Sequence, residues 1–315
     1  MSDDAAMMPP PLPDRVPSMP RTEVIARLSG LDPRRNAFRS DLASTMLAGR
    51  VEVPQFVEGE ARQIMRASVP LRRRPAANAA LDTEALFGET LVVYDIADGW
   101  AWVQLDRDGY VGYLPADTLG QDVQEPTHRV RAIGTFLYPV PDIKAPPLMH
   151  LSLNAQLSVA EGDDKFCLLT TGGFVYTRHI SPMGRFVRDY VSVAEMLIGT
   201  PYLWGGRTRI GIDCSGLVQN ALDAAGVLCP RDSDMQEAEV GTSIAITPEL
   251  EDLKRGDLLF WPGHVGMMVD GLMLLHANAH HMAVVVETLP EVVERIAKAG
   301  SPLRTIKRVG DEAAA

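Results

Sequence analysis

Residues 66–183 carry one pattern of short β-type runs twice, and this repeat restricts the possible folds more than any other feature of the chain. Each copy has an alternating strand, an acidic turn with glycine, a second strand and a glycine-aromatic hairpin. In the first copy these segments are "TLVVY", "DIADGW", "AWVQL" and "DGYVGYL". Strands this short cannot bury a face alone, so each copy is expected to close into a small barrel. We predict two such domains, at residues 66–122 and 123–183.

The hydrophobic pattern becomes helical after residue 184. The segments "DYVSVAEMLIG" and "CSGLVQNALDAAG" place apolar residues on one stripe and end at Gly199 and Gly226, which suit helix C-termini. The later segment "GDLLFWPGHVGMMVDGLMLLHAN" predicts three strands. Helices followed by an antiparallel sheet are typical of an α+β domain, predicted here at residues 184–315. Residues 1–65, which start proline-rich, are predicted to be a partly disordered N-terminal extension.

The charge and cysteine content limit which partners the protein is expected to bind and in which cellular compartment it is expected. The 315 residues carry a formal net charge of −11, which repels nucleic acids and anionic membranes at long range. Three cysteines are too few for a disulfide framework and leave at least one thiol free. The start of the chain has no export-signal pattern, and no apolar run reaches the ~18 residues of a membrane span. We therefore expect a soluble cytoplasmic protein that binds no nucleic acid and no membrane.

The stretch "IDCSGLVQ" places Cys214 at the expected start of a helix. Backbone N–H groups at a helix N-terminus have no intrahelical partner, and the helix dipole favours negative charge there. This position favours the thiolate, which is the nucleophilic form of cysteine. Ser215 and Gly216 keep the first turn small, so that a substrate carbonyl can approach. A buried structural cysteine is the alternative, with about equal weight on this stretch alone.

Two histidines on a predicted hairpin supply a candidate base for this thiol. If Val269, Asp270 and Gly271 form a three-residue loop with Gly271 in the left-handed region, His264 lies directly opposite His276. One imidazole can then take the cysteine proton while the other orients its ring. With a two-residue loop the pairing slips, and the two histidines face opposite ways.

Six motifs carry a resemblance to a known family: "GTPYLWGG", "DCSGLVQ", "PRDSDMQ", "GDLLFW", "HVGMMV" and "LLHAN". Their order and spacing resemble the NlpC-type cell-wall cysteine peptidases, a papain-like family. The repeated β-type copies resemble bacterial SH3-like domains. This combination resembles the γ-D-glutamyl-L-diamino-acid endopeptidases of the dipeptidyl-peptidase VI kind. The resemblance implies hydrolysis of small murein peptides, L-Ala-γ-D-Glu-diamino acid, through a thioester.

The resemblance also implies the roles of four residues in catalysis. Cys214 is the implied nucleophile, His264 the base and His276 its orienter. Tyr202, in "GTPYLWGG", matches a tyrosine near the oxyanion, and the backbone N–H of Cys214 is the other expected donor.

Substrate contacts are implied for residues beside the nucleophile and in the first SH3-like domain: Asp213, Ser215, Ser233, Tyr110 and Glu84. Tyr110 and Glu84 are expected to join Asp213 in an anionic pocket for the free α-amine of L-Ala. Glu89 is the alternative to Glu84, and a helix N-cap is the alternative role of Asp213. Three arginines near the motifs are candidates for the α-carboxylate of D-glutamate: Arg207, Arg209 and Arg231.

Other functions share some of these features. His276, His280 and His281 suggest a metal site, but no second ligand cluster accompanies them, so neither a metal nor a cofactor is predicted. A non-catalytic wall-peptide binding protein would use the SH3-like pair alone. An acyltransferase would use the same thioester with an amine in place of water.

Overall fold

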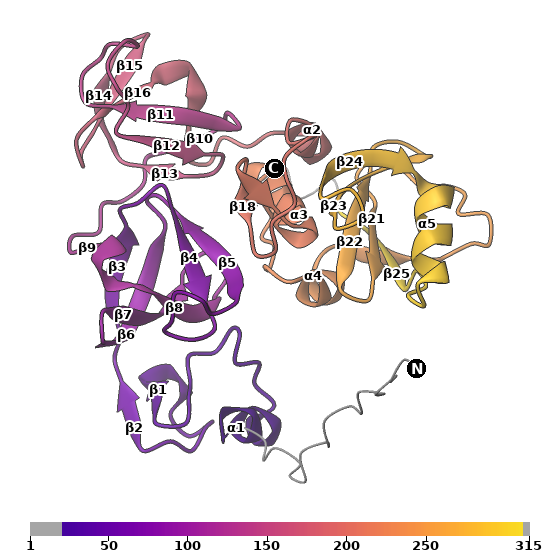
Figure 1. The fold of residues 1–315 in the computed structure, drawn as a ribbon, viewed down its shortest axis with the longest axis horizontal. Helices are drawn as coiled ribbons and strands as arrows, with labels where there is room; N and C mark the ends of the chain where they lie inside the picture. Colours follow the sequence, from indigo (N-terminus) through magenta and orange to yellow (C-terminus); the bar gives the residue numbers. More distant parts are fainter. Residues whose placement is uncertain (1–20, 311–315) are drawn as a thin grey trace, which may run out of the picture.

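The computed structural model describes residues 21–310 and divides them into an N-terminal segment, two strand-rich units and a mixed C-terminal unit (Figure 1). The proline-rich start, which the sequence predicts to be disordered, lies outside the described residues. Within residues 21–310, no helix has the length and apolar character needed to cross a membrane.

The N-terminal segment is folded over residues 21–57 rather than being a free extension. It consists of α1 (Arg21–Ser29), β1 (Leu42–Ser44), the 3-10 helix η1 (Thr45–Leu47) and β2 (Gln55–Val57). The segment has its own small core around Phe38. It also docks on the next unit, because the backbone carbonyl of Arg34 accepts from the Val111 N–H at 2.8 Å.

The first strand-rich unit is one seven-stranded sheet with the order β5-β4-β8-β7-β6-β3-β9. Its elements are β3 (Glu60–Ile64), β4 (Ser68–Arg72), β5 (Leu81–Leu86), β6 (Thr90–Ala97), β7 (Trp100–Leu105), β8 (Val111–Pro115), η2 (Ala116–Thr118) and β9 (Leu119–Gly120). Because β3 belongs to this sheet, the unit starts before the predicted boundary at residue 66. Asp98 and Gly99 both have positive φ in the β6 to β7 turn, which is the conformation of a two-residue hairpin.

The second strand-rich unit has two sheets that share one core. A five-stranded sheet has the order β12-β11-β16-β15-β14, and a three-stranded sheet has the order β13-β10-β17. The elements are β10 (His128–Val130), β11 (Gly134–Tyr138), β12 (Met149–Ser152), β13 (Gln156–Leu157), β14 (Val159–Gly162), β15 (Phe166–Leu169), β16 (Phe174–Tyr176), η3 (Thr177–His179) and β17 (Ile180–Pro182). Val130 and Val175, one from each sheet, are both fully buried in that core. The SH3-like character of this unit stays a prediction.

The C-terminal unit has helices first and then an antiparallel sheet, which confirms the predicted α+β class. The first part contains α2 (Tyr190–Glu195), β18 (Arg207–Thr208), β19 (Gly211–Ile212), α3 (Cys214–Ala224) and α4 (Ser233–Glu239). The six-stranded sheet has the order β20-β25-β21-β22-β23-β24. Its strands, with the last helix, are β20 (Thr242–Ile244), β21 (Leu258–Trp261), β22 (His264–Met268), β23 (Met273–Asn278), β24 (Ala283–Thr288), α5 (Leu289–Lys298) and β25 (Thr305–Arg308).

The two faces of this sheet pack against different helices. Leu217 of α3 packs with Val265 and Ala277 on one face, and Val292 of α5 packs with Leu274 on the other. Figure 1 shows α3 between the sheet and the strand-rich units, and α5 on the far side. The start of α3 therefore lies where the sheet and the strand-rich units meet.

Candidate active site

Cys214 is the first residue of α3, and Asp213 is the N-cap of that helix. One carboxylate oxygen of Asp213 accepts from the Gly216 N–H at 2.7 Å, and the other accepts from the Gly205 N–H at 2.7 Å. Arg231 donates to both oxygens, at 3.0 and 2.7 Å. The structure thus places Asp213 beside the thiol in the N-cap role, with its charge already paired.

Burial decides the ionisation of the thiol. Cys214 is 6% exposed, and desolvation raises its pKa to about 12. The neighbouring charge of Asp213 raises the pKa further, while a hydrogen bond from the Val265 backbone and the charge of Arg231 oppose the rise. The expected preference for thiolate is therefore wrong for the free protein, because desolvation outweighs the helix N-terminus. Cys214 needs a base.

The two histidines are joined, with His264 Nε2 2.9 Å from His276 Nδ1. His264 begins β22 beside Val265, the residue whose backbone binds the sulfur. Burial, and next the charge of His276, lower the pKa of His264 to about 3. The imidazole of His264 is therefore neutral at physiological pH and able to accept a proton.

The hairpin that carries the histidines differs in register from the expected one. Met268 pairs with Leu274 and the Val269 N–H donates to the Met273 carbonyl at 2.8 Å, so the loop is residues 270–272 rather than 269–271, and Gly271 is not in the left-handed region. Asp270 closes the loop by accepting from two backbone N–H groups, both at 2.8 Å. Continued along the strands, this register sets His264 opposite residue 278 instead of His276. The shift is an even number of residues, so both histidines keep the same face of the sheet.

Glu287 and Arg295 extend this pair, and the sequence analysis missed both. Glu287 lies on β24, and its Oε2 is 2.8 Å from His276 Nε2. Arg295 of α5 binds the same carboxylate through two nitrogens, at 2.6 and 2.8 Å. Burial raises the pKa of Glu287, but hydrogen bonds from Arg295 and His276 lower it to about 2. A carboxylate only accepts, so it assigns the proton of His276 to Nε2.

That assignment fixes the direction of the whole hydrogen-bond chain. With the His276 proton on Nε2, its Nδ1 accepts from His264 Nε2, which leaves His264 Nδ1 free as a base. The amide nitrogen of Asn278 donates to Glu287 Oε2 at 3.4 Å, and its oxygen accepts from the His281 N–H at 2.8 Å. The 2.9 Å approach of this nitrogen to His276 Nε2 joins two donors in this tautomer and is not a hydrogen bond. The amide nitrogen of Asn278 thus supports the carboxylate.

The remaining predicted catalytic neighbour, Tyr202, also lies at the thiol. It is half-buried and packs against the core that contains Cys214. Burial and the charges of Cys214 and Asp213 raise the pKa of Tyr202, so its hydroxyl stays protonated and can donate a hydrogen bond. Ser215 has its Oγ between Asp213 and Arg231, at 3.3 and 2.8 Å.

Tyr110 does not have the predicted partner. Its hydroxyl donates to Asp232 at 3.0 Å, and burial followed by the charges of Asp232 and Asp82 raises its pKa. The Glu84 carboxylate instead accepts from the Arg207 N–H at 2.8 Å. The predicted group of Tyr110, Glu84 and Asp213 is therefore not formed, because Glu84 faces the interface with the C-terminal unit. The acid that Tyr110 contacts instead of Glu84 is Asp232, the N-cap residue of α4. Asp232 directly precedes the predicted Ser233.

The N-terminal segment also contacts Asp232. Arg34 donates to Asp232 at 2.8 Å and binds Asp234 at 2.7 Å. Its guanidinium is also held by Asp32, at 2.7 Å. This contact has no local sequence signal, because nothing in "LDPRRN" indicates a partner 198 residues away.

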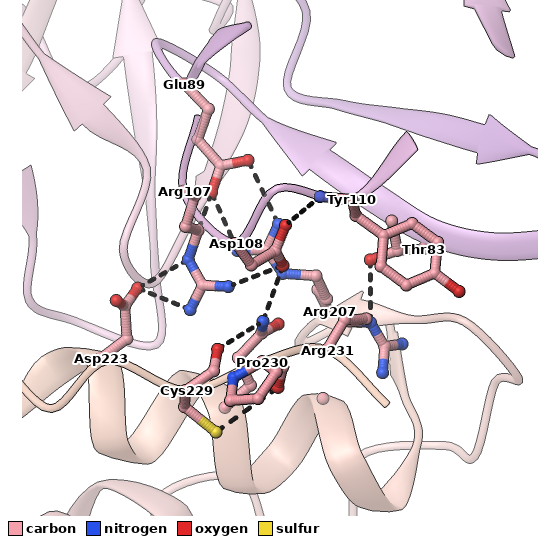
Figure 2. Close-up of polar contacts among 12 residues, drawn as sticks. Thr83, Glu89, Arg107, Asp108, Tyr110, Arg207, Asp223, Cys229, Pro230 and Arg231 are labelled. Atoms are coloured by element: carbon pink, nitrogen blue, oxygen red, sulfur yellow. Dashed lines mark hydrogen bonds and ion pairs between the residues drawn. The ribbon is translucent and has the colours of Figure 1, made fainter. Parts of the chain in front are cut away.

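A buried polar network joins the first strand-rich unit to the C-terminal unit (Figure 2). Arg207 is fully buried and donates to Glu89 at 2.8 Å. On the same interface Arg107 binds Asp223 at 2.9 Å. Glu89, the alternative to Glu84, is thus also an interface residue.

The predicted carboxylate-binding arginines are differently engaged. Arg207 and Arg231 are buried and paired with Glu89 and Asp213. Arg209 is exposed, and its charge adds to burial in lowering the pKa of His150 in the second strand-rich unit. Neither buried guanidinium is free to receive a substrate carboxylate. Within residues 21–310, no three His, Cys, Asp or Glu side chains are grouped as metal ligands.

Two parts of the chain match known protein families. Residues 199–295 match the NlpC/P60 family, and residues 71–119 match the bacterial dipeptidyl-peptidase Sh3 domain. The chain is 28% identical over 238 residues to gamma-D-glutamyl-L-lysine dipeptidyl-peptidase of Bacillus subtilis. The aligned region covers 68% of this chain and 77% of that relative. The chain is also 28% identical over 245 residues to dipeptidyl-peptidase 6 of Lysinibacillus sphaericus, covering 70% of this chain and 89% of the other.

A solved structure shares the fold. An NlpC/P60 family protein from Bacillus cereus superposes with a TM-score of 0.66 at 21% identity, covering 79% of this chain and 99% of that chain. This likeness extends the fold comparison beyond residues 199–295 into the strand-rich units.

Proposed function

From the premise that this chain is a cysteine peptidase with an NlpC/P60 domain at residues 199–295, we propose that it hydrolyses the γ-D-glutamyl to L-diamino-acid bond of short murein peptides with a free N-terminal L-Ala. The names of the relatives from Bacillus subtilis and Lysinibacillus sphaericus support this substrate class. The observation that carries the chemistry is the hydrogen-bond chain from His264 through His276 to Glu287.

We assign the acylation step to Cys214 and His264. The neutral His264 Nδ1 takes the thiol proton as the sulfur attacks the γ-carbonyl carbon, and the oxyanion receives the Cys214 N–H and the Tyr202 hydroxyl. The C–N bond then breaks, the proton passes from His264 to the leaving amine, and a thioester remains. His264 next takes a proton from water, which attacks the thioester. That proton returns to the sulfur, which leaves as the thiol.

We assign recognition of the substrate amine to Tyr110 and Asp232, with Asp213 and Ser215 beside the thiol and Ser233 next to Asp232. An ammonium group gains a charge-assisted hydrogen bond of about 1.5–3 kcal/mol from a carboxylate.

The test is mass spectrometry of L-Ala-γ-D-Glu-diaminopimelate incubated with the purified protein, and of the corresponding lysine peptide. We expect L-Ala-D-Glu and the free diamino acid as products. Cys214→Ala should abolish cleavage, whereas Cys229→Ala, which changes another buried free thiol, should not. Turnover by Cys214→Ala would refute the assignment of the nucleophile.

Acyl transfer on the same thioester remains the alternative. An added amine such as L-lysine separates the two, because a transferase would convert most acyl groups to the amide product while a hydrolase releases mainly L-Ala-D-Glu. A cytoplasmic location and a role in murein peptide recycling stay predictions.

A further inference from the structure

A cavity of about 370 Å³ lies between the second strand-rich unit and the helices of the C-terminal unit. Its walls include Val130 of β10, Ser181 of β17, Val193 of α2 and Ala224 of α3. Ala224 is the last residue of α3 and Cys214 is the first. The cavity is therefore at the opposite end of the nucleophile helix, roughly 15 Å along its axis from the thiol.

The charged side chains that line this cavity are all arginines: Arg129, Arg131 and Arg185. Arg129 is 8% exposed, and its guanidinium donates only to backbone carbonyls, those of Asp223, Ala224 and Arg185, at 2.8–2.9 Å. Burial lowers its pKa, and the one acid that opposes this effect is Asp223. The Asp223 carboxylate is already paired with Arg107 at 2.9 Å. Arg129 is thus a buried cation with no carboxylate of its own.

Arg131 and Arg185 add to this positive charge. Both are exposed, and neither has an ion-pair partner among the residues that the structure describes. The remaining lining residues include no acid. In a chain with a net charge of −11, a cavity lined by three unpaired arginines attracts an anion.

Asn154 adds a hydrogen-bond acceptor to the cavity wall. Its side chain is nearly buried, at 4% exposed, and its Nδ2 donates to the Asn220 carbonyl at 2.9 Å, which fixes the orientation of the amide. Its Oδ1 is buried and has no partner within residues 21–310. A buried acceptor without a donor costs about 1–3 kcal/mol, which a ligand N–H group would recover.

Apolar side chains line the rest of the cavity. Phe186 and Met196 are each 46% exposed, and the guanidinium carbon of Arg129 lies 4.6 Å from the centre of the Phe186 ring. These surfaces favour a ligand with an apolar group over a bare inorganic anion. We propose that this cavity binds a small carboxylate that also carries an N–H donor and an apolar group, the chemistry of an N-acylated amino acid or the C-terminus of a short peptide.

The probe for this site is N-acetyl-L-leucine, with N-acetyl-L-leucinamide as its uncharged counterpart. Calorimetric titration of the full chain should show binding of the acid in the millimolar range, with the amide at least ~10-fold weaker because it lacks the charge-assisted hydrogen bonds to arginine. The double variant Arg131→Gln, Arg185→Gln should weaken binding of the acid by ~10-fold and leave the amide unchanged. Both residues are exposed, so the fold should be retained.

The matched control is the double variant Arg27→Gln, Arg50→Gln, which removes two exposed arginines of the N-terminal segment. It should bind the acid as the unaltered protein does. Equal affinity for acid and amide, full affinity in the Arg131 and Arg185 variant, or no binding of the acid at ~50 mM would each overturn the proposal. Inorganic phosphate that binds as tightly as N-acetyl-L-leucine would overturn the apolar part of the site. None of these outcomes depends on peptidase activity, so the test of this cavity is independent of the test of the proposed function.

Discussion

Two groups of side chains that the proposed function assigns to Cys214 and its substrate are assembled in different ways. His264, His276 and Glu287 come from neighbouring strands of one sheet, β22, β23 and β24. Tyr110, Asp232 and Arg34 come from three separate units, and their contacts join residues 122 and 198 positions apart. The first group is complete within the C-terminal unit alone. The second exists only when the N-terminal segment and the first strand-rich unit are docked.

In the proposed function, this difference separates chemistry from selectivity. A group within one sheet can transfer protons in any domain of this fold, whereas a group that spans three units can restrict which substrates reach the thiol. The buried ion pair between Arg207 and Glu89 crosses the interface between the first strand-rich unit and the C-terminal unit. Such a pair is costly to break on one side, because the partner is left as an unpaired buried charge.

The largest expected effect concerns the group that spans three units. N-acetylation of L-Ala-γ-D-Glu-diaminopimelate removes the ammonium charge and adds bulk, so kcat/KM should fall by ~10⁴-fold. Tyr110→Phe should reduce this discrimination, while Tyr113→Phe, on the neighbouring strand β8, should leave it intact. Equal rates on both peptides would refute the proposed amine pocket and leave the strand-rich units without a role in substrate selection.

The next largest effect distinguishes the two histidines of the group on the sheet. In the proposed mechanism His264 transfers the proton, so His264→Ala should lower kcat by ~10²–10⁴-fold. His276 orients the ring and supports its charge, so His276→Ala should retain more activity than His264→Ala. Initial rates with and without added imidazole make the comparison. Complete loss in both variants, with rescue only of His276→Ala, would reverse the two roles.

Glu287→Gln should have a smaller effect, of ~10²-fold or less on kcat with KM unchanged. The carboxylate touches no substrate atom in the proposed mechanism, but it assigns the His276 proton, and a wrong tautomer disables the base. Glu287→Asp should recover part of the rate. Glu291→Gln, on the exposed side of α5, is the control. A change in KM alone would indicate a role in binding instead.

The smallest effect is on the pH profile. The pKa of His264 is lowered to about 3, and its neutral form is the active base. A base with a lowered pKa becomes protonated only at more acidic pH, so kcat/KM should hold nearly constant from pH 8 to pH 5. An acid limb centred near pH 6.5, the ordinary value for histidine, would show that the imidazole is solvated in the free enzyme.

Much of the fold follows from local pattern. The strands of the first unit, the start of a helix at Cys214 and the hairpin of His264 and His276 were all predicted from alternation, turn residues and helical spacing. Patterns failed where a contact joins distant segments. Local pattern also misplaced the loop of the histidine hairpin by one residue: it was predicted at 269–271 and lies at 270–272, where Asp270 accepts from the Leu272 and Met273 N–H groups.

Two functional contacts lacked any sequence signal that the analysis used. In "VVVETL", Glu287 has the pattern of an exposed acid at the end of a strand. Only its cross-strand position near His276 could have indicated the contact between the two side chains. Asp232 was passed over for Glu84, because the prediction followed a resemblance in one barrel loop rather than the packing of α4 against Tyr110.

The thiol shows most clearly what each level determines. The sequence by itself placed Cys214 at a helix N-terminus, followed by small residues, because that position depends on its immediate neighbours. Only the tertiary structure determined its ionisation, since desolvation depends on every unit that packs around the sulfur, and it raises the pKa to about 12. The same holds for the contacts at Asp232: Tyr110 and Arg34 meet this carboxylate only through docking, because charge and hydrogen bonding act through space and not along the chain.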